Sequence, residues 1–292
     1  MALDDTADPR YWDALADCYL EQVLTPFDRG VDFSLPARLD LHLRQLERAG
    51  LARRSVALDL GFGCGDSLAC HGGRLGLSIG LDFSPGMIAA ASARPDLSAP
   101  RRSTQPAAAE RARAIRRRRR GPLPPGEGEL LLVRGDMRRL QPLHAGADLV
   151  LAINSLTGGS LDYARTMFSQ AGACVAPGGQ LWAVFPAREA MRHLEDLIAR
   201  SGRPRPRGLG QVEDHSGVYV DGSGGRQKFW GAEEIDEALA AAGLRRVHRE
   251  RVPYPWRLVA ESGWGHFPRA RRLWDWFVIG ERAPAGRAML GP

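Results

Sequence analysis

The sequence predicts an α/β protein built on a doubly wound, mostly parallel sheet of seven strands, with an antiparallel strand at its C-terminal edge. Three observations support this fold class. Short apolar segments alternate with helix-like segments along the 292 residues, an order that favours a parallel sheet covered by helices. The first of these segments are almost wholly apolar, which is typical of strands buried on both faces. The chain closes on a helix followed by two strands, and this pattern predicts the antiparallel edge.

The N-terminal region, residues 1–54, predicts a helical cap ahead of the sheet. Residues 10–29 are rich in aromatic side chains and helical in character. Residues 36–50 predict a clearer amphipathic helix, because leucines recur at one side of it and Gly50 is a stop signal.

The sheet is expected to begin with two apolar runs. The first run, residues 55–60, is followed directly by a glycine cluster, and the second run, residues 77–82, ends in an acid. Ser84 and Pro85 then provide a helix start, with serine as the N-cap and proline at the first helical position. A hairpin is expected around residues 221–225. The remaining expected strands are 130–133, 147–153, 180–185, 244–252 and 274–279, and the expected helices are 161–174, 187–200 and 232–242.

Positive charge is concentrated in one segment. The chain has 40 basic and 34 acidic residues, a net charge of +6, and a basic balance is typical of proteins that bind nucleic acid or anionic surfaces. Residues 98–120 hold nine arginines and one glutamate, so the rest of the chain is slightly acidic. Because residues 95–128 are rich in proline, alanine and arginine without apolar periodicity, we expect an insertion or a disordered loop there.

The cysteines and the N-terminal sequence indicate the cellular compartment in which the protein is expected. The four cysteines show neither a CxxC pair nor the His/Cys spacing of a metal site. The first residues are acidic and no apolar h-region follows them, and no run of 18 apolar residues occurs. We therefore expect a cytoplasmic protein with reduced thiols and with neither a metal nor a membrane partner.

The glycine loop after the first strand indicates a nucleoside site. Gly61, Gly63 and Gly65 follow a strand and precede a helix, and an acid, Asp82, ends the next strand. A carboxylate at that position can accept hydrogen bonds from both hydroxyls of a ribose. A dinucleotide loop would need a small residue at position 66, where this chain has Asp66, whose charge would repel phosphate. A nucleoside without phosphates fits better than a dinucleotide.

Five segments together resemble a Rossmann-like family, the class I S-adenosylmethionine-dependent methyltransferases. The matching segments, in family order, are residues 56–65, 80–87, 134–137, 148–155 and 175–179. Segments of the second half, residues 225–230, 252–256 and 274–277, resemble a bacterial subgroup whose substrate is unassigned. The resemblance implies S-adenosylmethionine as cofactor and S-adenosylhomocysteine as product.

The resemblance also implies a division of the chain after the cap of residues 1–54. Residues 55–185 would be the cofactor-binding core, interrupted by residues 95–128. Residues 186–230 would form a substrate lid or insertion, and residues 231–292 would complete the core with a helix and strands.

The adenosine part of the cofactor is implied to contact five residues. Asp82 would bind the ribose hydroxyls. Phe83 and Met87 would flank the adenine. Asp136 would accept from the adenine amino group, and the Met137 backbone N–H would meet a ring nitrogen.

The methionine part is implied to lie on the glycine loop, held by Asp59, Gly61, Gly63 and Gly65. Phe62 belongs to the same loop, and it stands where a small residue or cysteine is commoner in the family.

Other residues would act near the transferred methyl group. Tyr11 and Trp12 resemble an N-terminal segment that closes over the cofactor in many members, and Asn154 would face the methyl group and the substrate. A general base would help only if the acceptor must lose a proton. The candidates are His215, which lies in the segment where such enzymes build a substrate lid, and Asp214, His193, Tyr163 and His266.

Methyl transfer to a small molecule, at oxygen or nitrogen rather than carbon, is the function expected, in secondary metabolism and by a monomer or a homodimer. One alternative is an RNA methyltransferase that uses the arginine run as a tether. It is disfavoured because the fourth strand is followed by Asn154-Ser155-Leu156 rather than by the Asn/Asp-Pro-Pro-aromatic motif of enzymes that hold a flipped adenine. A second alternative is a protein of this fold that binds the cofactor without transferring methyl.

Overall fold

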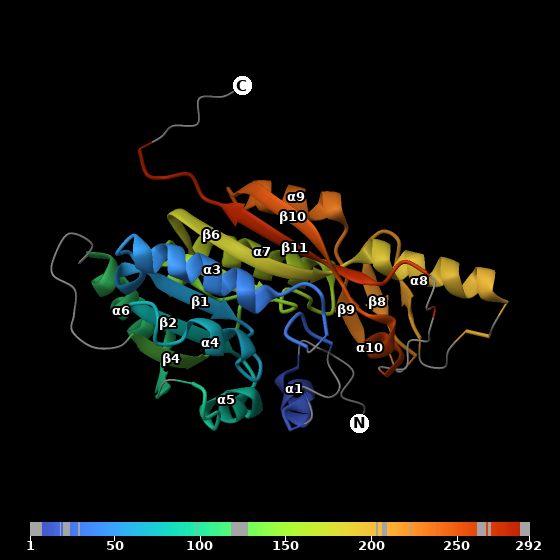
Figure 1. Ribbon diagram of the computed structural model, residues 1–292, viewed down its shortest axis with the longest axis horizontal. Coiled ribbons are helices and arrows are strands. Elements are labelled where there is room, and N and C mark those ends of the chain that lie inside the picture. Colours follow the sequence, from blue (N-terminus) through green and yellow to red (C-terminus); the bar gives the residue numbers. More distant parts are fainter. Residues whose placement is uncertain are drawn as a thin grey trace.

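A computed structural model describes most of the chain. The described residues are 8–17, 19, 24–28, 30–97, 99–117, 128–202, 204–205, 209–222, 224–261, 267 and 270–286. Their centre is one eight-stranded sheet with helices packed on both faces (Figure 1).

The sheet has the strand order β10-β11-β6-β5-β1-β2-β4-β3. Pairing is parallel except where β11 joins β6 and β10. The predicted fold class is therefore confirmed, with β10 as the edge strand and the antiparallel β11 one position inside it. The strands are β1 (Val56–Leu60), β2 (Leu77–Asp82), β3 (Arg101–Ser103), β4 (Glu129–Arg134), β5 (Ala147–Ile153), β6 (Val175–Pro186), β10 (Arg245–Pro253) and β11 (Trp274–Glu281).

Several helices cover the sheet by turning an apolar side toward it. In α3, for example, Leu35, Leu39 and Leu43 are fully buried at one-turn spacing. Figure 1 shows α3 and α4 in front of the sheet and α7 behind it. No described helix is long and apolar enough to cross a membrane. The helices are α1 (Pro9–Leu15), α3 (Leu35–Arg48), α4 (Asp66–His71), α5 (Pro85–Ser92), α6 (Gln105–Arg117), α7 (Leu161–Cys174), α8 (Arg188–Ser201), α9 (Ala232–Ala241), α10 (Trp256–Glu261) and the short 3₁₀ helices η1 (Ala52–Arg54) and η3 (Gln141–Leu143).

A small antiparallel sheet lies between α8 and α9 in the sequence. It has the order β7 (Gln211–Val212), β8 (Val218–Val220) and β9 (Arg226–Lys228). The hairpin expected around residues 221–225 is confirmed as the β8–β9 connection. Lys228, the only lysine of the chain, anchors this sheet: its fully buried ammonium pairs with Glu234 of α9 at 2.7 Å and donates to the Phe229 carbonyl.

Residues 95–128 were expected to be an insertion or a disordered loop, and the alternative of a disordered loop is wrong for residues 101–117. Residues 101–103 form β3, which pairs in parallel with β4 and raises the strand number from seven to eight. Residues 105–117 form α6, whose Ala108, Ala112 and Ile115 are buried. The buried side of α6 is made largely of alanines, so its periodicity is weak in the sequence although it packs against the sheet. Residues 118–127 lie outside the described residues.

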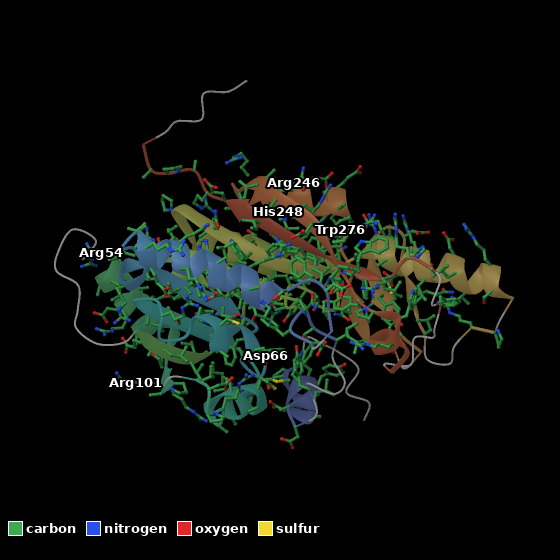
Figure 2. All side chains as sticks on the ribbon, in the orientation of Figure 1. Arg54, Asp66, Arg101, Arg246, His248 and Trp276 are labelled. Carbon is green, nitrogen blue, oxygen red and sulfur yellow. The ribbon has the colours of Figure 1, made fainter. Side chains whose placement is uncertain are left out.

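Several arginines of this segment pair with acids of the protein itself. Arg101 and Arg111 both contact Glu129, and Arg116 lies 2.8 Å from Asp148. Arg101, the first residue of β3, lies at the periphery of the molecule (Figure 2). Much of this charge therefore belongs to the surface of a folded helix and strand.

Candidate functional site

The glycine loop follows β1 and holds three glycines in the left-handed backbone region. Gly61, Gly63 and Gly65 have φ of 66°, 55° and 91°. A Cβ at Gly61 would lie only 2.5 Å from Ser155 Cβ, so the loop passes close against the end of β5. Gly65 starts α4, and Asp66 beside it pairs with Arg94 at 2.5 Å.

Asp82 ends β2 and faces this loop. Its two oxygens accept backbone hydrogen bonds from Gly63 at 3.0 Å and from Ser84 at 2.9 Å. The residue is only 5% exposed, and this burial raises the pKa of its carboxyl to about 6 although the hydrogen bonds act in the opposite direction. A third backbone hydrogen bond comes from Phe83. Because a carboxylate has about four lone pairs, it keeps capacity for a further donor.

A cavity opens where the parallel strands end. Ligand sites of doubly wound sheets lie in this place. Its lining combines the glycine loop with the segments that follow β2, β4 and β5. The lining residues are Trp12, Tyr19, Gly61, Gly63, Asp82, Phe83, Met87, Gly135, Asp136, Met137, Ile153, Asn154, Ser155, Thr157, Gly158, Tyr163 and Met167.

Eight residues expected at the cofactor site meet in this cavity. They are Gly61, Gly63, Asp82, Phe83, Met87, Asp136, Met137 and Asn154. The Asp136 carboxylate is bound by Arg138 through an ion pair of 2.6 Å, while the Arg138 guanidinium stacks 4.5 Å above the ring of Tyr163. Burial acts to raise the pKa of Asp136, but the hydrogen bonds from Arg138 outweigh it and hold this pKa below its ordinary value.

Three residues expected at the cofactor site lie behind the cavity wall. Asp59 is buried beneath the loop, where it accepts from Ser67 Oγ and lies 3.5 Å from His71 Nε2. Phe62 turns into an apolar cluster and packs on Gly80, where a Cβ would lie 2.8 Å from its ring. Gly65 contributes its backbone to the start of α4.

The N-terminal segment reaches the cavity through Trp12 and Tyr19. Tyr11 is not a lining residue; its ring stands edge-on to that of Trp12 at 5.0 Å. Asp13 attaches α1 to the start of α5, because its Oδ1 accepts from Ser84 Oγ at 2.5 Å and from Gly86 N at 2.8 Å.

Of the candidate bases that the structure describes, Tyr163 alone lines the cavity. His215 is exposed in the turn between β7 and β8, and Asp214 next to it pairs with Arg192 at 2.9 Å. His193 Nε2 contacts the carbonyl of Arg271. His266 lies outside the described residues.

A polar cluster behind Asn154 was missed by sequence reasoning. Asn154 Nδ2 donates to Asp275 Oδ2 at 3.2 Å, and the Tyr254 hydroxyl donates to the same oxygen at 2.7 Å. The sequence held one signal of it, since Asp275 is an acid between two tryptophans in an otherwise apolar strand. No group of metal-ligating side chains occurs within the part of the chain that the structure describes.

The sequence matches no family model and no curated protein, whereas many solved structures share its fold. One is magnesium protoporphyrin IX methyltransferase from Synechocystis PCC 6803 with bound S-adenosylmethionine. Its TM-score is 0.50 at 13% identity, over 97% of this chain and 99% of that one. Another is an S-adenosylmethionine-dependent methyltransferase from Methanosarcina mazei, with a TM-score of 0.50 at 15% identity, over 82% of this chain and 97% of that one. The chain therefore has the fold of the S-adenosylmethionine-dependent methyltransferases.

Proposed function

We propose that the protein is an S-adenosylmethionine-dependent methyltransferase that acts on a small-molecule acceptor at oxygen or nitrogen. The observation that carries this proposal is the Asp82 carboxylate, which is held by backbone N–H groups in a cavity beside a left-handed glycine loop. The proposal places the enzyme in the bacterial cytoplasm, acting as a monomer or homodimer on a secondary metabolite.

The residues of the cavity fit the adenosine part of this cofactor. Asp82 would accept from the two ribose hydroxyls. Phe83 and Met87 would enclose the adenine, Asp136 would accept from its amino group, and the Met137 N–H would donate to a ring nitrogen. Gly61 fits as well, because the absence of a side chain lets the loop pass close against Ser155 while forming part of the cavity wall. The loop from Gly61 to Gly63 would hold the methionine part.

When bound, S-adenosylmethionine supplies a methyl group on a positively charged sulfur, and the acceptor's lone pair displaces it in line, so the carbon–sulfur bond breaks and its electron pair stays on sulfur. The protein's contribution is positioning and exclusion of water. Trp12, Ile153 and Met167 give the cavity apolar walls, and Asn154 and Ser155 give it polar atoms where the acceptor would lie. The acceptor's proton passes to solvent.

The ion pairs of the arginine run favour this function over tethering of RNA. Arg101, Arg111 and Arg116 of the arginine run are already paired with Glu129 or Asp148. Positive charge that is compensated within the protein contributes little to phosphate binding.

Titration calorimetry with S-adenosylmethionine and S-adenosylhomocysteine tests the cofactor assignment. Wild-type protein should bind both, and Asp82→Asn should weaken binding about 10- to 100-fold, because one charged acceptor of two hydroxyls is lost. Glu237→Gln, an exposed carboxylate on α9, is the matched control and should bind as wild type does. Absence of binding by wild-type protein, or equal affinity in Asp82→Asn, would contradict the assignment.

Release of S-adenosylhomocysteine in the presence of fractionated bacterial metabolites then tests transfer. Cofactor-dependent release with one fraction identifies the acceptor. Binding of cofactor with no release from any fraction would favour the alternative of a cofactor-binding protein without transferase activity.

A further inference from the structure

Asn154 is held in an unusual backbone conformation at the wall of the cavity. Its φ of 53° lies in the left-handed region, where asparagine is tolerated better than most residues. Its backbone N–H donates to the Val184 carbonyl at 2.9 Å, so the turn after β5 is fixed against β6. The side chain of Asn154 therefore leaves this turn in a defined direction.

The carboxylate of Asp275 decides which end of the Asn154 amide faces it. Asp275 already accepts from the Tyr254 hydroxyl and from the backbone N–H of Ala187. An ionised carboxylate only accepts, so the NH₂ end of the amide must turn toward Asp275, as the 3.2 Å contact of Nδ2 indicates. The carbonyl end is then turned away from Asp275.

That carbonyl oxygen is buried and has no hydrogen-bond partner among the described residues. Ser155 Oγ, on the next residue, is also buried and without a hydrogen-bond partner among the described residues. A buried acceptor without a donor is unfavourable, and such a group in a native structure calls for a ligand or water that donates to it. Both residues line the cavity, so a donor would arrive from the cavity.

We propose that Asp275 and Tyr254 are positioning residues that hold the Asn154 amide with its carbonyl oxygen toward the acceptor, so that the site selects acceptors with an O–H or N–H group on a flat, apolar body. The apolar body follows from the neighbouring walls of Ile153 and Tyr163. This inference rests on the proposed function, because it names the acceptor class of the same cavity.

The arrangement also suits the reaction. A neutral acceptor atom becomes more positive as its bond to the methyl carbon forms, so a hydrogen bond from that atom to Asn154 Oδ1 strengthens along the way. After transfer to a hydroxyl and loss of its proton, the product has no hydrogen to donate. The product then leaves Oδ1 unpartnered again, and its release is favoured.

The ionisation of Asp275 controls this orientation. Burial raises the pKa of Asp275 to about 7 although Tyr254, Asn154 and the Ala187 N–H act to lower it. Asp28 is a further acid whose charge acts on Tyr254. Once protonated, Asp275 can itself donate to the Asn154 carbonyl, and the amide can turn around. The preference for donors should therefore weaken below about pH 7.

Two pairs of probes test the inference: 2-naphthol against 2-methoxynaphthalene, and indole against N-methylindole. Within each pair the body is nearly the same and only one compound donates. Affinities are measured by ligand-observed NMR at pH 8, both with free protein and with excess S-adenosylhomocysteine. Wild-type protein should bind the donor of each pair roughly 10-fold more tightly than its methylated partner.

Three variants separate the roles of the cluster. Asp275→Asn should lose the donor preference, because the new amide accepts either orientation of Asn154. Asn154→Gly should also lose it while keeping the left-handed turn. Tyr254→Phe removes a hydrogen bond that lowers the pKa of Asp275, so this pKa should rise. The variant should keep the donor preference at pH 8. As the pH is lowered from 8, it should lose the preference earlier than wild type does.

Equal affinities for donor and methylated probes in wild-type protein, or an unchanged preference in both Asp275→Asn and Asn154→Gly, would overturn the inference. Thermal unfolding and S-adenosylhomocysteine binding of Asp275→Asn establish that the variant is folded. The two proposals fail separately, because donor preference is also measured without cofactor, whereas failure of the proposed function would appear as absent cofactor binding.

Discussion

A buried carboxylate supports each end of the cavity, Asp82 in its wall and Asp275 behind Asn154, but the two are held differently. Asp82, at the cofactor end, is held by backbone N–H groups of Ser84, two residues further along the chain, and of Gly63, in the loop that follows the adjacent strand β1. Asp275, at the acceptor end, is held by the side chains of Asn154 and Tyr254, which come from distant parts of the chain. A backbone cradle can keep its form through many side-chain changes, whereas a side-chain cluster can change its specificity with one substitution.

The largest expected effect of a single substitution lies at the cofactor end. Gly61→Ala would force a left-handed alanine whose Cβ lies 2.5 Å from Ser155 Cβ, so the loop must move away from the cavity. We expect S-adenosylhomocysteine affinity to fall at least about 100-fold, since displacement of the loop would disturb its proposed contacts with the methionine part. Titration calorimetry measures this.

Gly202→Ala is the matched control, because Gly202 has φ of 63° but nothing within 4 Å of an added Cβ. It should show only the stability cost of the backbone strain, about 1 kcal/mol, and normal cofactor affinity. If the two variants bind cofactor equally well, close approach of the loop is not what the site needs.

The next expected effect is on stability, at the acceptor end. The pKa of Asp275 is raised to about 7 in the folded protein from an ordinary 3.8, so the folded state keeps this proton while the unfolded state loses it. The wild-type protein therefore loses stability between about pH 4 and 7 relative to a variant without this carboxyl. The free energy of unfolding of Asp275→Asn minus that of wild type should therefore increase by roughly 2–4 kcal/mol between pH 4 and pH 8.

Urea unfolding at a series of pH values measures this difference. Asp214→Asn, at a side chain that is 92% exposed, is the control and should follow the wild-type curve. A constant difference between Asp275→Asn and wild type from pH 4 to 8 would mean that Asp275 ionises normally.

The smallest effect is the pH dependence of cofactor binding. The pKa of Asp82 is raised to about 6 by burial, and hydroxyl donors favour its charged form, so binding should be strongest above pH 6. Below that pH the dissociation constant for S-adenosylhomocysteine should rise by about 10-fold per pH unit. Asp82→Asn should show no such rise, and an equally steep rise in that variant would assign the titration to another group.

The two ends also differ in how far the sequence predicted them. The strands β1 and β2, the glycine loop and Asp82 follow from local patterns, because the loop and the acid are each tied to the end of a neighbouring strand. The Asn154–Asp275 contact joins residues 121 positions apart, and no local pattern reveals that kind of pairing. Asn154 was predicted to face the substrate, but its partners were not found.

The arginine-rich segment shows a different limit of sequence reasoning. Alanines such as Ala108 and Ala112 bury little surface each, so they give a weak apolar signal even though they let α6 pack closely on the sheet. The conspicuous arginines on the exposed side obscured that pattern. Composition located the charge correctly but did not distinguish a folded amphipathic helix from a loop.

A crystal structure with S-adenosylhomocysteine tests the central claim most directly. We expect both ribose hydroxyls within about 2.5–3.0 Å of the Asp82 carboxylate oxygens, with the adenine between Phe83 and Met87 and its amino group at Asp136. Ligand bound elsewhere, or bound in the cavity with its ribose away from Asp82, would contradict it.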